Sequence, residues 1–234
     1  MAVANIDTVY QRVLALANKE QRGYITPQEF NLLAGKAQND IFEMYFHDYK
    51  TALLSPGNDT KTADDLSGLE HKIDIHRRKN ASVPSATNLP TDVHYLESLY
   101  YDHTSLGRVV IEEVSIKDYH QIKSNPKLSP MQSRPIYYRS SSASSVIKVE
   151  PFPTGFAVKC DYIKRPTDPR WGYVVVNEKA LYNANTTVGF ELHASEESTL
   201  TNKILELAGI VINKPGLSEV ILRNEAVKEA NENK

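Results

Sequence analysis

The chain has 234 residues, which is long enough to bury a sizeable core without disulfides or metals. It contains 27 Lys and Arg and 29 Asp and Glu, a net charge of −2. This composition does not indicate binding to nucleic acid or to an acidic membrane surface. The single cysteine, Cys160, excludes an internal disulfide framework and a cysteine metal cluster, and its alternating surroundings predict a small core residue. Without a signal-peptide pattern or a run of about eighteen apolar residues, we expect no membrane segment and synthesis in a reducing cytoplasm.

Residues 18–30, NKEQRGYITPQEF, have the pattern of an EF-hand calcium loop that runs into its exit helix. Asn18, Glu20 and Glu29 would occupy ligand positions of that loop. Arg22 falls on a further ligand position, where its guanidinium offers no lone pair and would place a cation beside the ion. A calcium-binding helix pair is therefore a minor alternative, and we predict no metal or cofactor site here.

Without metal, the same stretch encodes a corner between two helices. Gly23 suits the end of the first helix, and Thr26 followed by Pro27 suits the start of the second. Glu29 completes a T-x-x-E capping box, in which the two side chains satisfy each other's backbone N–H groups. We therefore expect the stretch to connect two helices.

The helices themselves are predicted from apolar spacing. Apolar residues recur at helical intervals over residues 6–17 and 30–45, which indicates two antiparallel helices. Residues 55–68 are polar and break this pattern, and residues 69–80 resume it only weakly. We expect a mobile arm or a short third helix in that region.

Helical texture returns over residues 195–210, with Ser195 as a predicted N-cap and Gly209 as a predicted C-terminal glycine. This helix should dock on the N-terminal helix pair through one apolar face. The expected face consists of Leu200, Ile204, Leu207 and Ala208. The chain after Asn213 is separated from this helix by Pro215 and Gly216, and we expect it to leave the subunit and to order only on a partner.

The middle of the chain has the composition of β-strands. Five short runs rich in β-branched and aromatic residues predict an antiparallel sheet region, with a short helix over residues 116–126 and a hairpin tip at residues 140–145. An extended connection should follow over residues 168–193. The five runs are residues 89–101, 107–115, 134–140, 145–153 and 156–166.

These elements predict an α+β fold in which a helical bundle from the two ends of the chain carries an inserted antiparallel β domain. We divide the chain into three parts. Residues 1–87 hold the N-terminal helices and the polar arm, residues 88–190 the β domain with its connecting loop, and residues 191–234 the helix and tail that complete the bundle.

The sequence lacks recognisable catalytic motifs. His71 and His76 are five residues apart, which fits neither the zincin nor the zinc-finger spacing, and we expect both on the surface of a helix. No G-x-S-x-G elbow or phosphate-binding glycine loop is present. Adjacent carboxylates such as Glu112 and Glu113 point apart, so they do not form a general acid and base pair. We predict no catalytic residues and no enzymatic activity.

The sheet region contains two tyrosine pairs, Tyr100 with Tyr101 and Tyr137 with Tyr138. Such rings could stack on sugars or bases, but paired tyrosines usually place one ring in a core and the other in an interface. A carbohydrate- or host-binding tail module is therefore an alternative. The combination of many tyrosines, long extended segments and a polar arm favours a subunit that completes its order on assembly.

Three parts of the sequence resemble one protein family. They are YQRVLALANKEQRGYITPQEFNLLAGKAQNDIFEMYF near the start, LPTDVHYLESLYY with RPIYYRS and KCDYIKRP in the middle, and FELHASEESTLTNKILELAGI near the end. The chain is similar in these parts to head-to-tail adaptor proteins of short-tailed bacteriophages, of the tail tubular protein A type, and particularly to the ring proteins of crAss-like phages.

The resemblance implies a virion structural protein. Its subunits would form a homo-oligomeric ring of about twelve copies between the portal protein and the downstream tail or ring proteins. The ring would line the passage for the DNA, with non-specific contact to it, and would involve no membrane. It would be assembled in the cytoplasm of the bacterial host and then lie in the neck of the virion. The C-terminal region would reach toward the portal.

Overall fold

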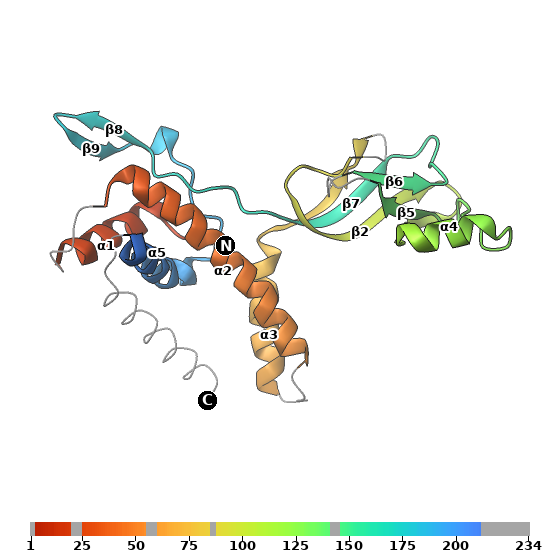
Figure 1. Cartoon of the computed structure of the whole chain (residues 1–234), viewed down its shortest axis with the longest axis horizontal. Coiled ribbons are helices and arrows are strands. Elements are labelled where there is room, and N and C mark those ends of the chain that lie inside the picture. Colours follow the sequence, from red (N-terminus) through yellow and green to blue (C-terminus); the bar gives the residue numbers. More distant parts are fainter. Residues whose placement is uncertain (1–2, 20–24, 55–59, 85–87, 141–145, 212–234) are drawn as a thin grey trace. The chain divides into compact units, whose positions relative to one another are not determined.

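The computed structural model confirms an α+β fold, drawn in Figure 1. The chain divides into two compact units. The first, here called the helical unit, contains residues 1–75 and 166–234, and the second, the β unit, contains residues 76–165. The structure describes residues 3–19, 25–54, 60–84, 88–140 and 146–211. The predicted loop Asn18–Gly23 is therefore largely outside the described residues, as is the predicted tail after Asn213.

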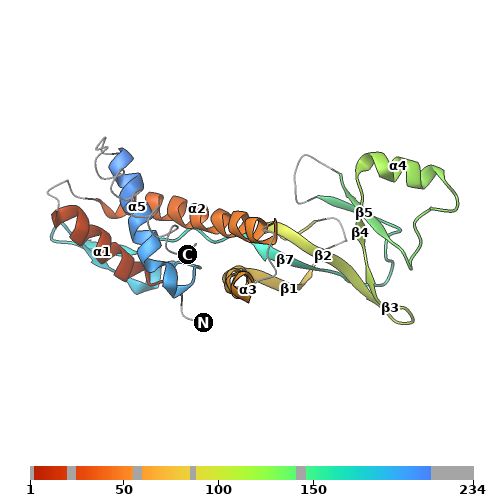
Figure 2. The same ribbon diagram turned by 90° about the horizontal axis from the view of Figure 1, so that it is seen from below.

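The described residues of the helical unit include four α-helices. They are α1 (Ile6–Lys19), α2 (Pro27–Leu54), α3 (Thr60–Asp74) and α5 (Glu197–Val211). Helix α5 packs against both α1 and α2, and α3 packs against α2, as Figures 1 and 2 show. The unit therefore joins the two ends of the chain, because α5 comes from the C-terminal part and its two partners come from the N-terminal part.

The start of α2 confirms the predicted capping box. The Thr26 N–H donates to Oε2 of Glu29 at 2.8 Å, and the Glu29 N–H donates to Oγ1 of Thr26 at 3.2 Å. Pro27 is the first helical residue. Ile25 and Phe30, on either side of the cap, are both buried. The corner thus follows from local side-chain chemistry.

Helix α5 buries an apolar face as predicted, with two corrections at its ends. Its buried apolar residues are Leu200, Ile204, Leu205 and Ala208, while Leu207 is only half-buried. Ser195 does not cap the helix but lies inside the 3-10 turn η3 (Ala194–Glu196), where His193 takes the capping position. Gly209 does not end the helix either, because α5 continues to Val211.

The connection between the units differs from the predicted arm. A third helix does form, α3, but the basic residues after it belong to strand β1 (Arg77–Ser82), which pairs with β7 (Val158–Lys164). The predicted surface position of His76 is wrong, because its side chain is 1% exposed, whereas His71 is exposed on α3 as expected. The predicted boundary at residues 87/88 accordingly shifts to 75/76.

The β unit contains a four-stranded antiparallel sheet in the order β1-β7-β2-β3, with β2 at Val93–His103 and β3 at Gly107–Val110. Alternation decides its two faces, since successive side chains of a strand point to opposite sides. Leu99, Tyr101 and Cys160 lie on the face that joins the buried apolar core. The predicted five runs are therefore strands, and only β1 was not predicted from the sequence.

A second, smaller sheet in the order β4-β5-β6 completes the β unit. Its strands are β4 (Glu112–Glu113), β5 (Ile136–Arg139) and β6 (Ile147–Glu150). The antiparallel pairing of β5 with β6 agrees with the predicted hairpin, whose tip at residues 141–145 lies outside the described part. The predicted short helix is α4 (Ile116–Ser124), which packs Tyr119 against Tyr138 with ring centroids 4.3 Å apart.

The extended connection after the sheet belongs to the helical unit. The predicted boundary at residues 190/191 therefore moves to 165/166. The predicted extended connection contains a two-stranded sheet of its own, formed by β8 (Tyr173–Val176) and β9 (Lys179–Tyr182). The exposed large apolar side chains of this segment are Val174, Val175, Val176, Leu181, Tyr182 and Val188.

Candidate protein-interaction site

The β8–β9 hairpin is closed by a two-residue turn. Asn177 has φ 49° and Glu178 has φ 63°, so both central residues have left-handed backbones. This is the pattern of a type I′ turn, whose twist matches that of the strands it connects. Asparagine tolerates the left-handed region, but glutamate rarely adopts it. The shape of the turn therefore suits a hairpin, but the backbone of Glu178 is moderately strained.

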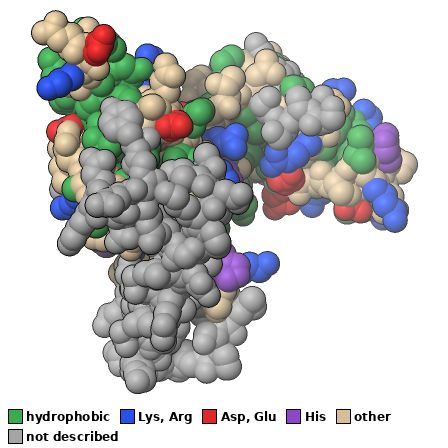
Figure 3. All heavy atoms as spheres, turned by 60° about the vertical axis from the view of Figure 1, so that its left-hand side comes forward, with side chains coloured by type: hydrophobic (Ala, Val, Ile, Leu, Met, Phe, Trp, Pro, Cys, Tyr) green, Lys and Arg blue, Asp and Glu red, His purple; other side chains and the backbone are tan. Residues whose placement is uncertain are grey.

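Both faces of this hairpin are apolar. Val174 is paired with Leu181 on one face, where their exposed fractions are 49% and 52%. Val175 lies on the other face and is 62% exposed. A hairpin that uses one face for its own protein normally alternates apolar and polar residues. Figure 3 shows the resulting concentration of hydrophobic side chains at the upper left, where the hairpin extends from the helical unit.

The base of the hairpin is fixed by Trp171, which is 2% exposed. The Trp171 ring lies 4.1 Å from that of Tyr10 on α1 and 5.9 Å from that of Tyr173, measured between centroids. Its Nε1 donates a hydrogen bond of 2.9 Å to Oδ1 of Asp7. One indole therefore contacts both the hairpin and the first helix, and its only polar atom is bonded to α1.

Two side-chain amides of α2 hold the backbone on either side of the hairpin. Asn31 accepts from the Trp171 N–H at 2.7 Å and donates to the Trp171 carbonyl at 3.3 Å. Gln38, which is 0% exposed, donates to the Thr167 carbonyl at 2.8 Å and accepts from the Glu191 N–H at 2.9 Å. These amides satisfy backbone groups that are not paired with a neighbouring strand. They attach the segment to α2 both before and after the hairpin.

Close packing at Gly172 fixes the path further. A Cβ at this position would collide with Thr186 and with the Asn183 carbonyl. The Gly172 N–H donates to Oγ1 of Thr187 at 3.1 Å, and Asn183 N–H donates to the Gly172 carbonyl at 2.8 Å. The result is a rigid base that holds an exposed apolar hairpin. Such a combination binds protein better than it binds small polar ligands.

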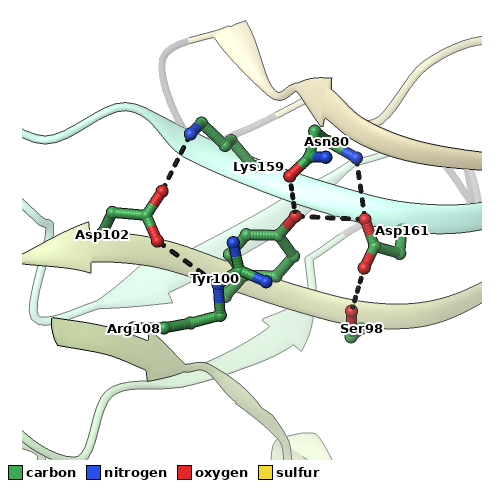
Figure 4. A network of polar contacts seen from close by, with 7 residues as sticks. All are labelled: Asn80, Ser98, Tyr100, Asp102, Arg108, Lys159 and Asp161. Atoms are coloured by element: carbon green, nitrogen blue, oxygen red, sulfur yellow. Dashed lines mark hydrogen bonds and ion pairs between the residues drawn. The ribbon is translucent and has the colours of Figure 1, made fainter.

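A polar network covers the other face of the large sheet in the β unit, as drawn in Figure 4. The Tyr100 hydroxyl donates to Oδ1 of Asn80 at 2.6 Å and also lies 3.1 Å from Oδ1 of Asp161. Ser98 donates to the second oxygen of Asp161 at 3.3 Å. Asn80 has φ 58° at a register shift in β1, and its N–H binds Asp161 at 2.8 Å.

The charged part of this network surrounds the Tyr100 ring. Asp102 receives Lys159 Nζ at 2.8 Å and Arg108 Nε at 3.3 Å, and the Arg108 guanidinium lies 4.2 Å from the ring centroid of Tyr100. The bonds from Lys159 and Arg108 lower the pKa of Asp102. Burial, with the bond to Asp161, raises the pKa of Tyr100. These groups stabilise one another and make β1, β2, β3 and β7 a single rigid sheet.

The tyrosine pairs of the sequence lie in the interior of the β unit. Tyr100, Tyr101, Tyr137 and Tyr138 are all buried, at 2%, 1%, 5% and 8% exposure. The expectation that one ring of each pair faces an interface is therefore wrong. Cys160 is a core residue as predicted, and burial raises the pKa of its thiol to about 11.

Within the part of the chain that the structure describes, no three His, Cys, Asp or Glu residues come together in a group that could hold a metal ion. Glu29, the last ligand position of the calcium pattern, is instead bonded to Thr26, and these bonds lower its pKa. The sequence did not single out Trp171, Asn31 or Gln38. The only signal available was an isolated tryptophan before a run of three valines.

The chain matches no protein-family model, and no curated protein is similar to it in sequence. Among the described residues, none of the helices combines the length and the apolar character that crossing a membrane requires.

Proposed function

We propose that the protein is a head-to-tail adaptor of a short-tailed bacteriophage, a subunit of a homo-oligomeric ring between the portal and the tail. The observation that carries this proposal is the anchored hairpin, which presents Val174, Val175 and Leu181 to solvent on a fixed base. An isolated two-stranded hairpin is only marginally stable in water, so a packing partner for its free face would stabilise it. An assembly subunit supplies such a partner.

The arrangement of the chain supports the same proposal. The resemblance of the sequence to adaptor proteins implies a helical part made from both ends with a β domain inserted between them. The helical unit does contain α1, α2 and α5, and the β unit is contributed by residues 76–165. Localisation in the virion neck, contact with the portal and passage of DNA through the ring belong to this proposal.

The host-binding alternative lacks an observation of its own. It depended on tyrosine rings that could stack on a sugar, and the four rings in question are all buried. The calcium alternative depended on a loop whose final glutamate is used in a helix cap.

Antibody labelling of purified virions in the electron microscope tests the proposal. We expect the label at the neck, between head and tail. A Val174→Ser, Leu181→Ser double variant should fold but be incorporated less well, because its hairpin loses apolar contact area. The matched control is Val110→Ser in the β unit, where the wild-type side chain is 55% exposed. Label at the tail fibres or its absence from virions would contradict the proposal.

A further inference from the structure

The near-neutral total charge of the chain hides a strong asymmetry between its two units. The β unit contains 13 Lys and Arg against 8 Asp and Glu, a net charge of +5. The helical unit contains the remaining 14 Lys and Arg against 21 Asp and Glu, a net charge of −7. Opposite potentials of this size on two parts of one molecule favour contacts between unlike parts.

The positive charge has an exposed centre at α4 and the loop that follows. Residues 115–134, here called the basic lobe, contain four basic residues and one acidic residue. Lys117 and Lys127 are exposed, and no ion pair joins either of them to the described residues. The single acid, Asp118, is bonded to Ser115 at the start of α4. The lobe therefore has uncompensated positive charge.

Exposed apolar side chains lie among these cations. Ile116 is 56% exposed, Leu128 is 48% exposed and Met131 is 57% exposed. Helix α4 turns Tyr119 and Ile122 toward the sheet and leaves Ile116 on its outer side, and Leu128 and Met131 follow in the loop after the helix. The exposed apolar side chains favour a protein partner for this surface, because a phosphate backbone would contact the cations and leave the apolar groups in water.

An oppositely charged surface is present in the same chain. Residues 40–54 and 60–75, which include the second half of α2 and all of α3, contain seven acidic and three basic residues. We call this part the acidic helix pair, since α2 and α3 pack together. Glu43, Glu70 and Asp74 have exposed side chains on it, and Met44 beside them is 46% exposed. Its charge is opposite to that of the basic lobe, and Met44 offers an apolar contact.

We infer that the basic lobe of one copy of this chain docks on the acidic helix pair of a second copy. The contact joins two different surfaces, so it repeats from copy to copy and builds a closed ring or a filament. The inference rests on the proposed ring function for its biological meaning. It adds the surfaces through which neighbouring subunits recognise each other.

Self-association of the full chain tests this inference, measured by sedimentation velocity over a range of protein concentrations. Assembly should weaken strongly between about 0.1 M and about 1 M salt, where the Debye length falls from about 10 Å to about 3 Å. Lys127→Glu should lower the association constant by about tenfold or more, because it places like charges in contact. Lys79→Glu is the matched control, an exposed lysine of the same unit outside the lobe, and should change little.

A charge exchange makes the test specific. Lys117→Glu with Lys127→Glu should abolish assembly, and so should Glu43→Lys with Glu70→Lys in a separate chain. Mixing the two variants should restore both contacts between unlike copies, one of them with wild-type residues and the other with the charges exchanged, and yield assemblies that contain both variants. Such mixed assemblies would support the inference, whereas their absence would overturn it.

Two further outcomes would also overturn it. One is a chain that remains monomeric in low salt at high concentration. The other is unchanged self-association of the Lys117→Glu, Lys127→Glu variant together with loss of its binding to duplex DNA, which would make the lobe a nucleic-acid surface. Neither result bears on neck labelling of virions, so failure of this inference is distinguishable from failure of the proposed function.

Discussion

The indole Nε1 of Trp171 donates a hydrogen bond of 2.9 Å to Oδ1 of Asp7, a residue 164 positions earlier in the chain. This bond connects the base of the exposed hairpin to the first turn of α1. It makes the orientation of the hairpin depend on correct folding of the helical unit. The hairpin therefore takes this orientation only in a chain whose residue 171 has packed on α1.

Replacing Trp171 by Ala should destabilise the helical unit. The change removes a buried ring in contact with Tyr10 and leaves the Asp7 carboxylate without its indole partner. We expect a loss of about 3–5 kcal/mol in the free energy of unfolding, as for other buried aromatic residues changed to Ala. Urea denaturation measures it. Trp171→Phe, which keeps most of the packing, should cost less, and equal losses for the two variants would contradict the importance of the ring.

Glu178→Gly should stabilise the hairpin. Glu178 has φ 63°, and a left-handed backbone costs a residue with a Cβ about 1–2 kcal/mol, a cost that glycine avoids. We expect slower hydrogen exchange of the β8 and β9 amides. Asn177→Gly is the control, with a smaller gain, because asparagine tolerates this conformation. Faster exchange in Glu178→Gly would indicate a side-chain contribution of Glu178 that outweighs its backbone strain.

Tyr100→Phe should weaken the β unit without changing its packing. The ring stays under the Arg108 guanidinium, but the hydrogen bonds to Asn80 and Asp161 are lost. A loss of about 0.5–1.5 kcal/mol is expected, the usual net contribution of a hydrogen bond, because Asn80 is exposed and water can replace the lost donor. The control is Tyr95→Phe, where the wild-type side chain is 59% exposed and little change should follow. Equal melting temperatures of the two variants would indicate that the network does not stabilise the sheet.

Acid should destabilise the β unit in part through Asp102. Lys159 and Arg108 lower the pKa of this carboxylate in the folded chain below its ordinary value of 3.8. Its contribution to stability is therefore complete above that value and disappears as the pH falls through the lowered pKa. Asp102→Asn should lose less stability than the wild type between about pH 5 and about pH 2, as measured by urea midpoints. A parallel pH dependence of the two proteins would contradict this assignment.

Thr26→Ala should cost about 1 kcal/mol, the usual effect of a lost N-cap. Thr26 accepts from the Glu29 N–H and donates to the Glu29 carboxylate, and Ala can do neither. Gln28→Ala changes an exposed position in the same turn and should be neutral. The difference in melting temperature between the two variants checks the prediction.

Local patterns determined much of this protein from the sequence alone. The capping box at Thr26 and Glu29, most of the apolar face of α5 and the strands of the β unit other than β1 were predicted, because their physical causes act between residues close in the chain. The core position of Cys160 followed from alternation in the same way. Each of these features needs only the identity of a few neighbouring side chains.

The tertiary structure alone decided where long-range partners meet. Residues 166–193 look like a continuation of the β region, yet Asn31 and Gln38 on α2 bind their backbone across 140 and 153 residues of sequence. His76 is buried because it lies where the chain enters the sheet, although its spacing fits an exposed helix face. The separation of charge into a basic and an acidic unit depends on the same chain path. Periodicity reports which face of an element is apolar, but the element that covers that face is fixed only when distant segments pack together.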